Sequence, residues 1–243
     1  TLDSQNYLDA DNNKKTDYTN AVTNAENILN PTQGTNLTKE QVQAATNQVN
    51  SAKNDLNGTL NLNNAKQQAT TNIDGLTNVT DAQKEALKQL VGNSSNVAEV
   101  QANLQKAQDV DQAMNHLKQS IADNTATKND QNYLDASPNK QEAYNNAIDS
   151  AKDIIDNTSN PSLDPTVINQ ATTNVTNAKN ELNGNDNLNQ AKQEANQTVG
   201  GLDNLNNAQQ HALNEQINHA TSVDEVNQIK NNAQNLNNAM AGL

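Results

Sequence analysis

Residues 97–136 read VAEVQANLQKAQDVDQAMNHLKQSIADNTATKNDQNYLDA, a stretch without glycine or proline. Its apolar residues recur every three or four positions, which is typical of one buried face of a helix. About 40 helical residues at about 1.5 Å each would span about 60 Å. We therefore predict one long helix that joins the two halves of the chain. The alternative is a flexible hinge in residues 123–130, where the apolar pattern thins. The apolar positions are Val97, Val100, Leu104, Ala107, Val110, Met114, Leu117 and Ile121.

The two halves that this helix would join are copies of one unit. The motif QNYLDA occurs at residues 5–10 and again at residues 131–136, an offset of 126 positions from Gln5 to Gln131. Asn57-Gly58 returns as Asn183-Gly184 at the same offset, without insertion. Tandem copies of constant length are typical of spacers and multivalent binders rather than of enzymes.

Shorter segments within each unit also have helical periodicity. Thr38 with Gln41, and Thr80 with Gln83, have the spacing of a capping box at a helix start. Asn30-Pro31 and Gly92 are typical places for a helix to end. These segments lie, in the first unit, near residues 18–29, 42–56, 62–76 and 79–91.

The composition excludes several classes of protein. Fifteen lysines and no arginine stand against 28 acidic residues, for a net charge of −13. Proteins that bind nucleic acids use Lys and Arg side chains to neutralise the phosphates, so we expect no nucleic-acid binding by this acidic chain. No apolar run approaches the roughly 20 residues of a membrane span, and we expect no membrane contact by this segment. Without cysteine there is no disulfide, thiol nucleophile or thiolate metal site. No signal peptide is recognisable at Thr1, and we read the sequence as a segment of a longer protein.

Three histidines are the candidates for a metal site. His211 and His219 are eight positions apart, so they lie on nearly the same helix face but two turns distant. That separation is too large for one ion, and His116 is isolated. We interpret all three as solvated surface residues and predict no metal site and no cofactor.

Two acidic pairs are candidates for acid–base catalysis: Asp109 with Asp111, and Asp224 with Glu225. Catalysis would need a cleft that shifts their pKa values, and slender helical bundles offer little enclosure. Acidic residues near a helix start also stabilise the helix dipole. We interpret them as surface residues and predict no catalytic residues and no enzymatic activity.

In the spacing of its apolar residues, the sequence resembles two known modules. The sequence resembles a FIVAR module in the pattern Tyr18-x-x-Ala21-Val22-x-x-Ala25, followed by Val42-x-x-Ala45-x-x-x-Val49-x-x-Ala52-Lys53-x-x-Leu56-Asn57-Gly58. The second unit repeats this pattern from Tyr144 to Gly184. The part that begins Leu62-x-x-Ala65-Lys66 and closes with Val97-x-Glu99-Val100 is similar to a GA module, a three-helix module of albumin-binding type. FIVAR–GA tandems rich in Asn and Gln resemble the family of giant staphylococcal extracellular-matrix-binding proteins.

The resemblance implies an extracellular, cell-wall-associated bacterial protein whose repeat region is a helical rod. It also implies binding of extracellular matrix, chiefly fibronectin, and a role in cell-envelope integrity. Serum albumin, through the GA modules, and wall or peptidoglycan glycan, through the FIVAR modules, are the alternative partners.

The middle helix of the GA-like part departs from the albumin-binding type, which presents an exposed apolar and aromatic patch. Residues 78–91 (NVTDAQKEALKQLV) and their copy at 204–217 (NLNNAQQHALNEQI) contain no aromatic residue. Interfaces depend on large apolar or aromatic anchors, and the apolar residues present are needed for the core. We therefore expect albumin to be a lesser partner than matrix proteins.

The four tyrosines are the only aromatic residues. Tyr18 and Tyr144 lie on helical apolar faces, so we predict that they pack in the core. Tyr7 and Tyr133 lie near the junction of two bundles. For these two, stacking on a sugar is the alternative that the FIVAR resemblance implies.

The sequence thus predicts an all-α fold of tandem three-helix bundles joined end to end by a long shared helix, in an elongated, monomeric rod. We expect a non-enzymatic structural and adhesive segment, with a specific albumin or glycan module as the alternative; no ligand-binding residue is identified. The predicted domains are a FIVAR-like bundle at 1–58, a GA-like bundle at 59–117, a FIVAR-like bundle at 118–184 whose first helix continues the preceding one, and a GA-like bundle at 185–243.

Overall fold

The computed structural model describes residues 1–243, which form helices and no strands, so the all-α prediction is confirmed. The chain divides into two compact structural units, called unit 1 and unit 2 from here on, whose bounds differ from those of the two sequence copies. Unit 1 comprises Thr1–Gln112 together with Thr158–Pro165, and unit 2 comprises Ala113–Asn157 together with Thr166–Leu243. One helix, α6 (Val97–Ile121), has its N-terminal part in unit 1 and its C-terminal part in unit 2.

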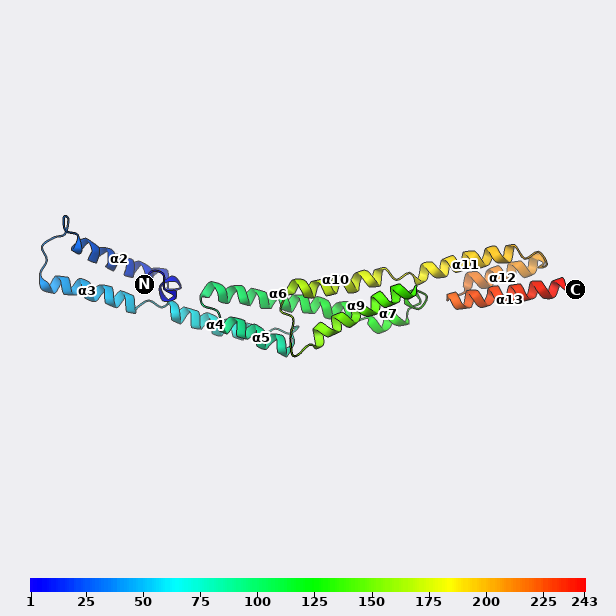
Figure 1. The fold of residues 1–243 in the computed structure, drawn as a ribbon, viewed down its shortest axis with the longest axis horizontal. Coiled ribbons are helices and arrows are strands. Elements are labelled where there is room, and N and C mark those ends of the chain that lie inside the picture. The colour runs from blue at the N-terminus through cyan, green and yellow to red at the C-terminus, as the bar shows by residue number, and fades with distance from the viewer. The chain divides into compact units, whose positions relative to one another are not determined.

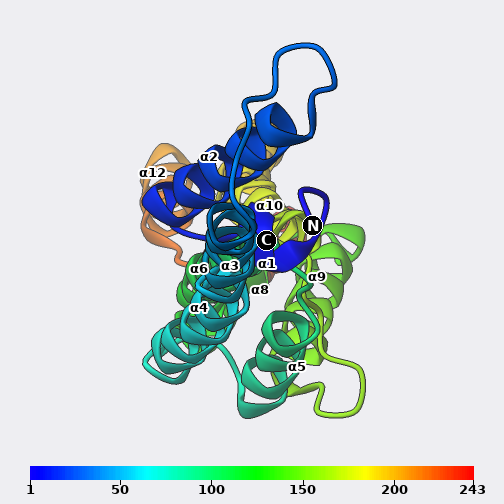
Figure 2. The same cartoon turned by 90° about the vertical axis from the view of Figure 1, so that its left-hand side faces the viewer.

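Unit 1 begins with a helical hairpin, followed by a bundle to which α6 contributes (Figure 1). Both views place α2 beside α3, and the loop that connects them extends past the helix ends (Figure 2). The helices of unit 1, besides α6, are α1 (Gln5–Leu8), α2 (Asn12–Leu29), α3 (Lys39–Asn54), α4 (Gly58–Asp74) and α5 (Asp81–Gly92).

Unit 2 contains the remaining helices. The C-terminal part of α6 lies with α9 and α10 in one bundle, and the last three helices form another (Figure 1). The helices are α7 (Asn124–Asn129), α8 (Gln131–Leu134), α9 (Pro138–Asp156), α10 (Pro165–Asn180), α11 (Gly184–Gly200), α12 (Asn207–His219) and α13 (Val223–Ala241).

The long shared helix is confirmed, because α6 runs through position 117 without interruption. Its predicted extension to residue 136 is wrong. The helix ends at Ile121, where the apolar pattern stops, and Asp130 has an extended backbone with ψ of 145°. The Asp130 side chain accepts a hydrogen bond from the Asn132 amide and so starts a new helix rather than continuing the old one.

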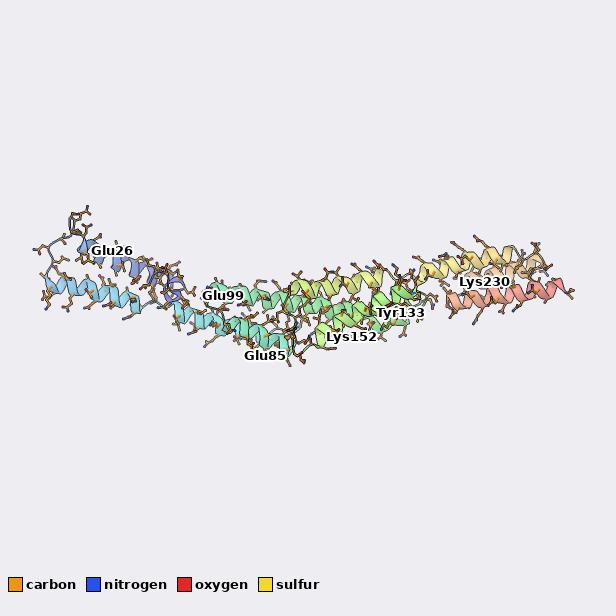
Figure 3. All side chains as sticks on the ribbon, in the orientation of Figure 1. Glu26, Glu85, Glu99, Tyr133, Lys152 and Lys230 are labelled. Carbon is orange, nitrogen blue, oxygen red and sulfur yellow. The ribbon has the colours of Figure 1, made fainter.

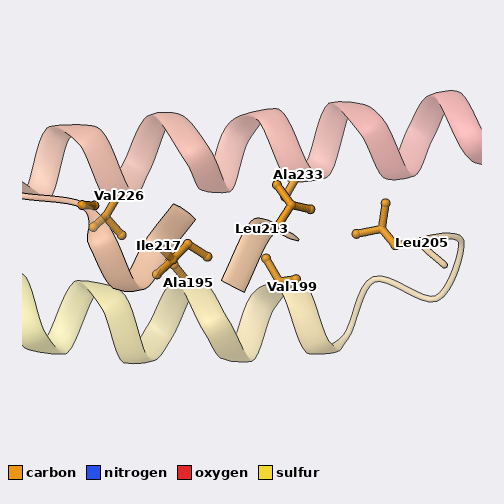
Figure 4. Packing of buried hydrophobic residues seen from close by; sticks show 8 residues of the cluster. Ala195, Val199, Leu205, Leu213, Ile217, Val226 and Ala233 are labelled. Atoms are coloured by element: carbon orange, nitrogen blue, oxygen red, sulfur yellow. The ribbon is translucent and has the colours of Figure 1, made fainter. Parts of the chain in front are cut away.

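The core of the last bundle is a thin row of small and branched side chains (Figure 4). The same positions, 126 residues earlier, are buried in unit 1. One of them is polar: Ser94 stands where the copy has Ala220, and its hydroxyl donates to the Leu90 carbonyl at 3.0 Å. The core residues of the last bundle are Ala195, Val199, Leu205, Leu213, Ile217, Ala220, Val226 and Ala233.

The helix starts follow the predicted capping boxes. In the box at Thr38, the Gln41 amide donates to the threonine hydroxyl while the Gln41 side chain accepts from the Thr38 amide. Thr80 and Gln83 make the same pair of bonds at the start of α5. These local bonds satisfy amides that a helix leaves free, so sequence alone suffices to place such starts.

Candidate binding surfaces

The QNYLDA motif holds the FIVAR-like and GA-like parts of each unit together. In unit 2, Asp135 Oδ2 accepts hydrogen bonds from Gln131 Nε2 at 2.6 Å and from the Val223 amide, the first of α13, at 2.9 Å. In unit 1, Asp9 Oδ2 accepts in the same way from the Val97 amide at 3.0 Å. A carboxylate at a helix N-terminus also stabilises the helix dipole. The motif was recognised in the sequence as a repeat, but its joining role became visible only in the fold.

The glycine that opens each GA-like part lies against this motif. A Cβ placed on Gly184 would stand 2.4 Å from the Asn132 carbonyl oxygen, and one on Gly58 would stand 2.3 Å from that of Asn6. A hydrogen bond next to this glycine also joins the two segments: the Asn185 amide donates to Asn132 Oδ1 at 3.0 Å. Only a residue without a side chain lets the two helices approach this closely.

The tyrosines pack in pairs. Tyr144 is fully buried and Tyr18 nearly so, which confirms their predicted place in the core. Tyr133 meets Tyr144 edge to face at 5.9 Å between ring centroids, and Tyr7 meets Tyr18 at 6.0 Å. Burial raises the pKa of the Tyr144 hydroxyl, because the phenolate would lose its hydration. Tyr7 and Tyr133 are therefore packing partners with one part of each ring left exposed.

A surface pocket of about 440 Å³ in unit 2 is lined in part by Tyr133, which is half-buried. Asp130 and Lys179 give it charges of both signs, and Asn132 and Asn180 add amides. A half-buried aromatic side chain beside hydrogen-bonding groups could accept a sugar, the alternative considered for this tyrosine.

The acidic residues considered for catalysis accept hydrogen bonds from nearby groups of the chain. Asp111 Oδ1 accepts from the Asn78 and Val79 amides at 2.7 and 3.1 Å and so holds the turn before α5. Glu225 accepts from the Thr221 amide at 2.8 Å at the start of α13. Asp109 accepts only from Gln105, one helical turn earlier.

The histidines are not gathered into a site. His211 is exposed and lies 3.5 Å from Glu215, and His219 contacts the Glu215 carbonyl at 2.8 Å. His116 is exposed on α6. No group of three or more His, Cys, Asp or Glu residues in the chain could hold a metal ion.

Glu99 gives the fold a specific acid sensitivity. Its carboxylate accepts from the Ser95 hydroxyl at 2.6 Å and from the Ser95 amide at 2.7 Å, and these bonds lower the pKa of Glu99 below its ordinary 4.5. The unfolded chain therefore binds a proton at a higher pH than the folded chain. The contribution of Glu99 to stability is complete above pH 4.5 and is lost as the pH falls toward the lowered folded-state pKa.

We accordingly expect Glu99→Gln to be less stable than the parent chain at neutral pH and to lose less stability on acidification from about pH 5 to about pH 3. Urea unfolding at several pH values measures this difference. Glu26→Gln is the control, since Glu26 is an exposed residue of α2 (Figure 3), and it forms no hydrogen bond or ion pair. Parallel acid profiles for Glu99→Gln and the parent chain would contradict the prediction.

The middle GA-like helices, α5 and α12, present polar surfaces. Their large apolar residues face inward, with Leu87, Val91 and Ile217 fully buried. None of the exposed large apolar side chains of the chain lies on either helix. In unit 1, Gln83 Nε2 also donates to the Ser162 carbonyl at 2.9 Å, so residues 158–165 cover part of α5. Sequence reasoning missed this contact, for which no local pattern exists.

An apolar concave surface lies between α2 and α3 in unit 1. It encloses about 220 Å³. Leu29 and Val42 at its edge are 79% and 43% exposed. We call this surface the α2–α3 groove; it is lined by Ala25, Ile28, Leu29, Val42, Ala45, Thr46, Val49 and Asn50.

None of the helices has the length and the apolar character needed to cross a membrane.

Comparison with known proteins agrees with this architecture. The model of the FIVAR domain matches residues 1–57 and 113–183, and that of the GA module matches residues 60–113 and 185–239. A crystal structure of residues 756–1003 of EbhA from Staphylococcus aureus superposes with a TM-score of 0.89 and 37% identity, covering 96% of this chain and 93% of that one.

Two curated relatives come from Staphylococcus aureus. The extracellular matrix-binding protein EbhA of strain Mu3 is 64% identical over all 243 residues, and so is the extracellular matrix-binding protein ebh of strain JH9. The present chain spans 4% of the length of the first and 2% of the second.

Two gapless copies of a unit, each made of packed helical segments, define a tandem-repeat protein of small helical modules. The FIVAR model matches more than half of the sequence. The chain belongs to the FIVAR domain family, and each of its FIVAR domains is followed by a GA module. The resemblance to FIVAR–GA tandems is thereby confirmed.

Proposed function

We propose that the chain is a non-enzymatic adhesive and spacer segment of a bacterial cell-surface protein, and that it binds extracellular matrix proteins, with fibronectin as the expected partner. The observation that carries this proposal is the 64% identity, over the whole chain, to a protein named for extracellular matrix binding. The alternation of FIVAR and GA modules along the chain also supports it.

The character of the surface favours weak and repeated contacts. Apart from the α2–α3 groove, the exposed faces carry mostly Asn, Gln, Thr and acidic side chains, and large apolar anchors are few. Tight interfaces usually depend on such anchors. Two equal units can instead bind through multivalency, in which a weak contact is multiplied by its repetition.

The test compares the chain as a monomer with the chain held as a tetramer on streptavidin, each flowed over immobilised fibronectin. We expect the tetramer to be retained with an apparent affinity at least about tenfold higher, because neighbouring units rebind. Absence of retention in both forms, at low and physiological salt, would overturn matrix binding through fibronectin.

Immobilised albumin and purified wall peptidoglycan are the comparison surfaces. Saturable binding of the monomer to albumin would favour the specific-module alternative, while the polar faces of α5 and α12 argue against it. Binding to peptidoglycan that Tyr133→Ala abolishes would favour the glycan alternative at the cavity beside this residue.

We also propose that the segment acts as a spacer at the cell wall and contributes to envelope integrity. The sequence-based expectation is an elongated monomer, which small-angle X-ray scattering tests directly. A pair-distance distribution with a single symmetric maximum, typical of a globule, would contradict the spacer role.

A further inference from the structure

The junction between the FIVAR-like and GA-like parts of each copy carries the two Asn-Gly dipeptides of the sequence, Asn57-Gly58 and Asn183-Gly184. An asparagine side chain cyclises onto the backbone most readily before glycine, because glycine has no side chain that hinders the attack. The fold needs glycine at this position, since a Cβ on Gly58 would stand 2.3 Å from the Asn6 carbonyl oxygen. Packing therefore places a chemically labile dipeptide at each junction.

In the first copy the Asn57 carboxamide is held against Asp11. The Asp11 amide donates to Asn57 Oδ1 at 2.9 Å, and Asn57 Nδ2 donates to Asp11 Oδ2 at 2.8 Å. Asn61 Nδ2 donates to the other carboxylate oxygen, Asp11 Oδ1, at 3.0 Å. These bonds, and most of all the one from Asn57, lower the pKa of Asp11, so its carboxylate stays charged. The contact connects the start of α4 to residues 9–11, between α1 and α2.

The second copy makes the same contact with a different partner. Ser137 stands at the position of Asp11, and its amide donates to Asn183 Oδ1 at 2.9 Å. In return, Asn183 Nδ2 donates to Ser137 Oγ at 3.0 Å. A hydroxyl can donate or accept a hydrogen bond, whereas a carboxylate only accepts. The contact of the first copy therefore depends on the side-chain hydrogens of Asn57, and that of the second copy does not depend on those of Asn183.

We propose that Asn57 is a self-modification site, at which deamidation breaks the contact between α4 and residues 9–11 in the first copy. The Gly58 amide nitrogen attacks Cγ of Asn57 and gives up its proton, and the side-chain nitrogen leaves as ammonia. Water then opens the cyclic imide at either of its carbonyl carbons and leaves aspartate or isoaspartate. The net reaction takes up water and releases ammonia, without oxidation or reduction.

The folded contact controls when this reaction occurs. Both polar atoms of the Asn57 carboxamide are bonded to Asp11, so its carbon reaches the Gly58 nitrogen only after the contact opens. An aspartate at residue 57 would place a carboxylate oxygen at the 2.8 Å spacing of the present bond to Asp11, with no hydrogen between the two oxygens. The open state is thereby made permanent in the first copy. At residue 183 the Ser137 hydroxyl donates to the new carboxylate instead. The inference does not depend on matrix binding.

Amide hydrogen exchange of the full chain tests the consequence, because the amides of residues 11 and 137 donate directly to the two asparagines. Asn57→Asp supplies the aspartate product, and we expect the protection of the residue 11 amide to fall at least about tenfold at neutral pH. Asn183→Asp should leave the protection of residue 137 close to that of the parent chain. Both variants place a negative charge at a helix start, where the dipole favours it, so the difference between them measures the repulsion.

Exchanging the partner residues separates repulsion from a general loss of structure. Asp11→Ser added to Asn57→Asp gives the first copy the pairing of the second and should restore the protection of residue 11. Ser137→Asp added to Asn183→Asp should remove the protection of residue 137. Full protection of residue 11 in Asn57→Asp, or failure of Asp11→Ser to restore it, would overturn the proposed repulsion.

Incubation of the parent chain in mildly alkaline buffer tests the modification itself, with peptide mass spectrometry that distinguishes aspartate from isoaspartate. The chain unfolded in urea, in which both asparagines are free to convert, sets the reference rate. We expect slower but measurable conversion of Asn57 in the folded chain, and molecules with aspartate at residue 57 should show the fast exchange of Asn57→Asp. A folded chain in which Asn57 stays intact over many half-lives of the unfolded reference would overturn the proposal.

Discussion

We expect replacement of Gly184 with alanine to destabilise unit 2 by about 2 kcal/mol, although the residue lies at the start of a helix, where alanine is normally the better choice. The new Cβ would stand 2.4 Å from the Asn132 carbonyl oxygen and 2.5 Å from that of Gln131. Both are backbone atoms, so relief requires α8 and α11 to separate. That separation also weakens the bond from the Asn185 amide to Asn132.

Gly200, at the other end of the same helix, is the matched control. A Cβ there meets nothing within 4 Å, and its φ is negative. Gly200→Ala should stabilise the chain by about 0.5 to 1 kcal/mol, because alanine restricts the unfolded chain more than glycine does. Urea unfolding of the two variants beside the parent chain measures both effects. A loss of stability for Gly200→Ala, or none for Gly184→Ala, would show that the close approach of the helices is not what selects glycine.

The second large effect is expected for Leu87→Ala, which removes a fully buried side chain from the middle helix of the first GA module. The bundle has a thin core of Val, Leu, Ile and Ala, so few neighbours can close the cavity that is left. Substitutions of this kind cost about 3 kcal/mol. We therefore expect a clear fall in the urea midpoint of unit 1.

Leu60→Ala is the matched control, because Leu60 belongs to the same module but is 58% exposed. It should change the free energy of unfolding by less than about 0.5 kcal/mol. The Leu87→Ala variant also tests whether Leu87 takes part in fibronectin binding. If Leu87 serves the core alone, fibronectin retention measured well below the unfolding midpoint should be the same for Leu87→Ala and the parent chain. Similar destabilisation by both substitutions would mean that the core of unit 1 differs from the one described.

Much of the fold could be predicted from local patterns. The starts of α3 and α5 lie at Thr38 and Thr80 because each capping box satisfies helix amides with residues three positions apart. The burial of Tyr18 and Tyr144 followed from their place on a helical apolar face. The 126-residue offset showed that both copies would carry the same modules, as the family matches confirm.

The end of the shared helix was harder to predict. Residues 122–130 contain no glycine or proline that would mark a helix end, and few apolar residues whose spacing would indicate a helix. Their conformation depends on bonds to distant parts of the chain, such as the salt bridge of Asp123 with Lys179. The joining roles of Asp135 and Gly184 also depend on helices far apart in sequence. A repeated motif reveals that such residues matter, but not which contacts they make.

The sequence by itself determined the helices, their caps and the repeated unit, because these depend on hydrogen bonds and apolar spacing within a few residues. Only the tertiary structure decided where the shared helix ends, how Asp9 and Asp135 connect the modules, and which apolar faces are covered. Val42 and Ile168 lie at equivalent positions of the same pattern, yet one is partly exposed and the other fully buried. Burial is decided by the segment that packs across a helix, and that segment can be distant in the chain.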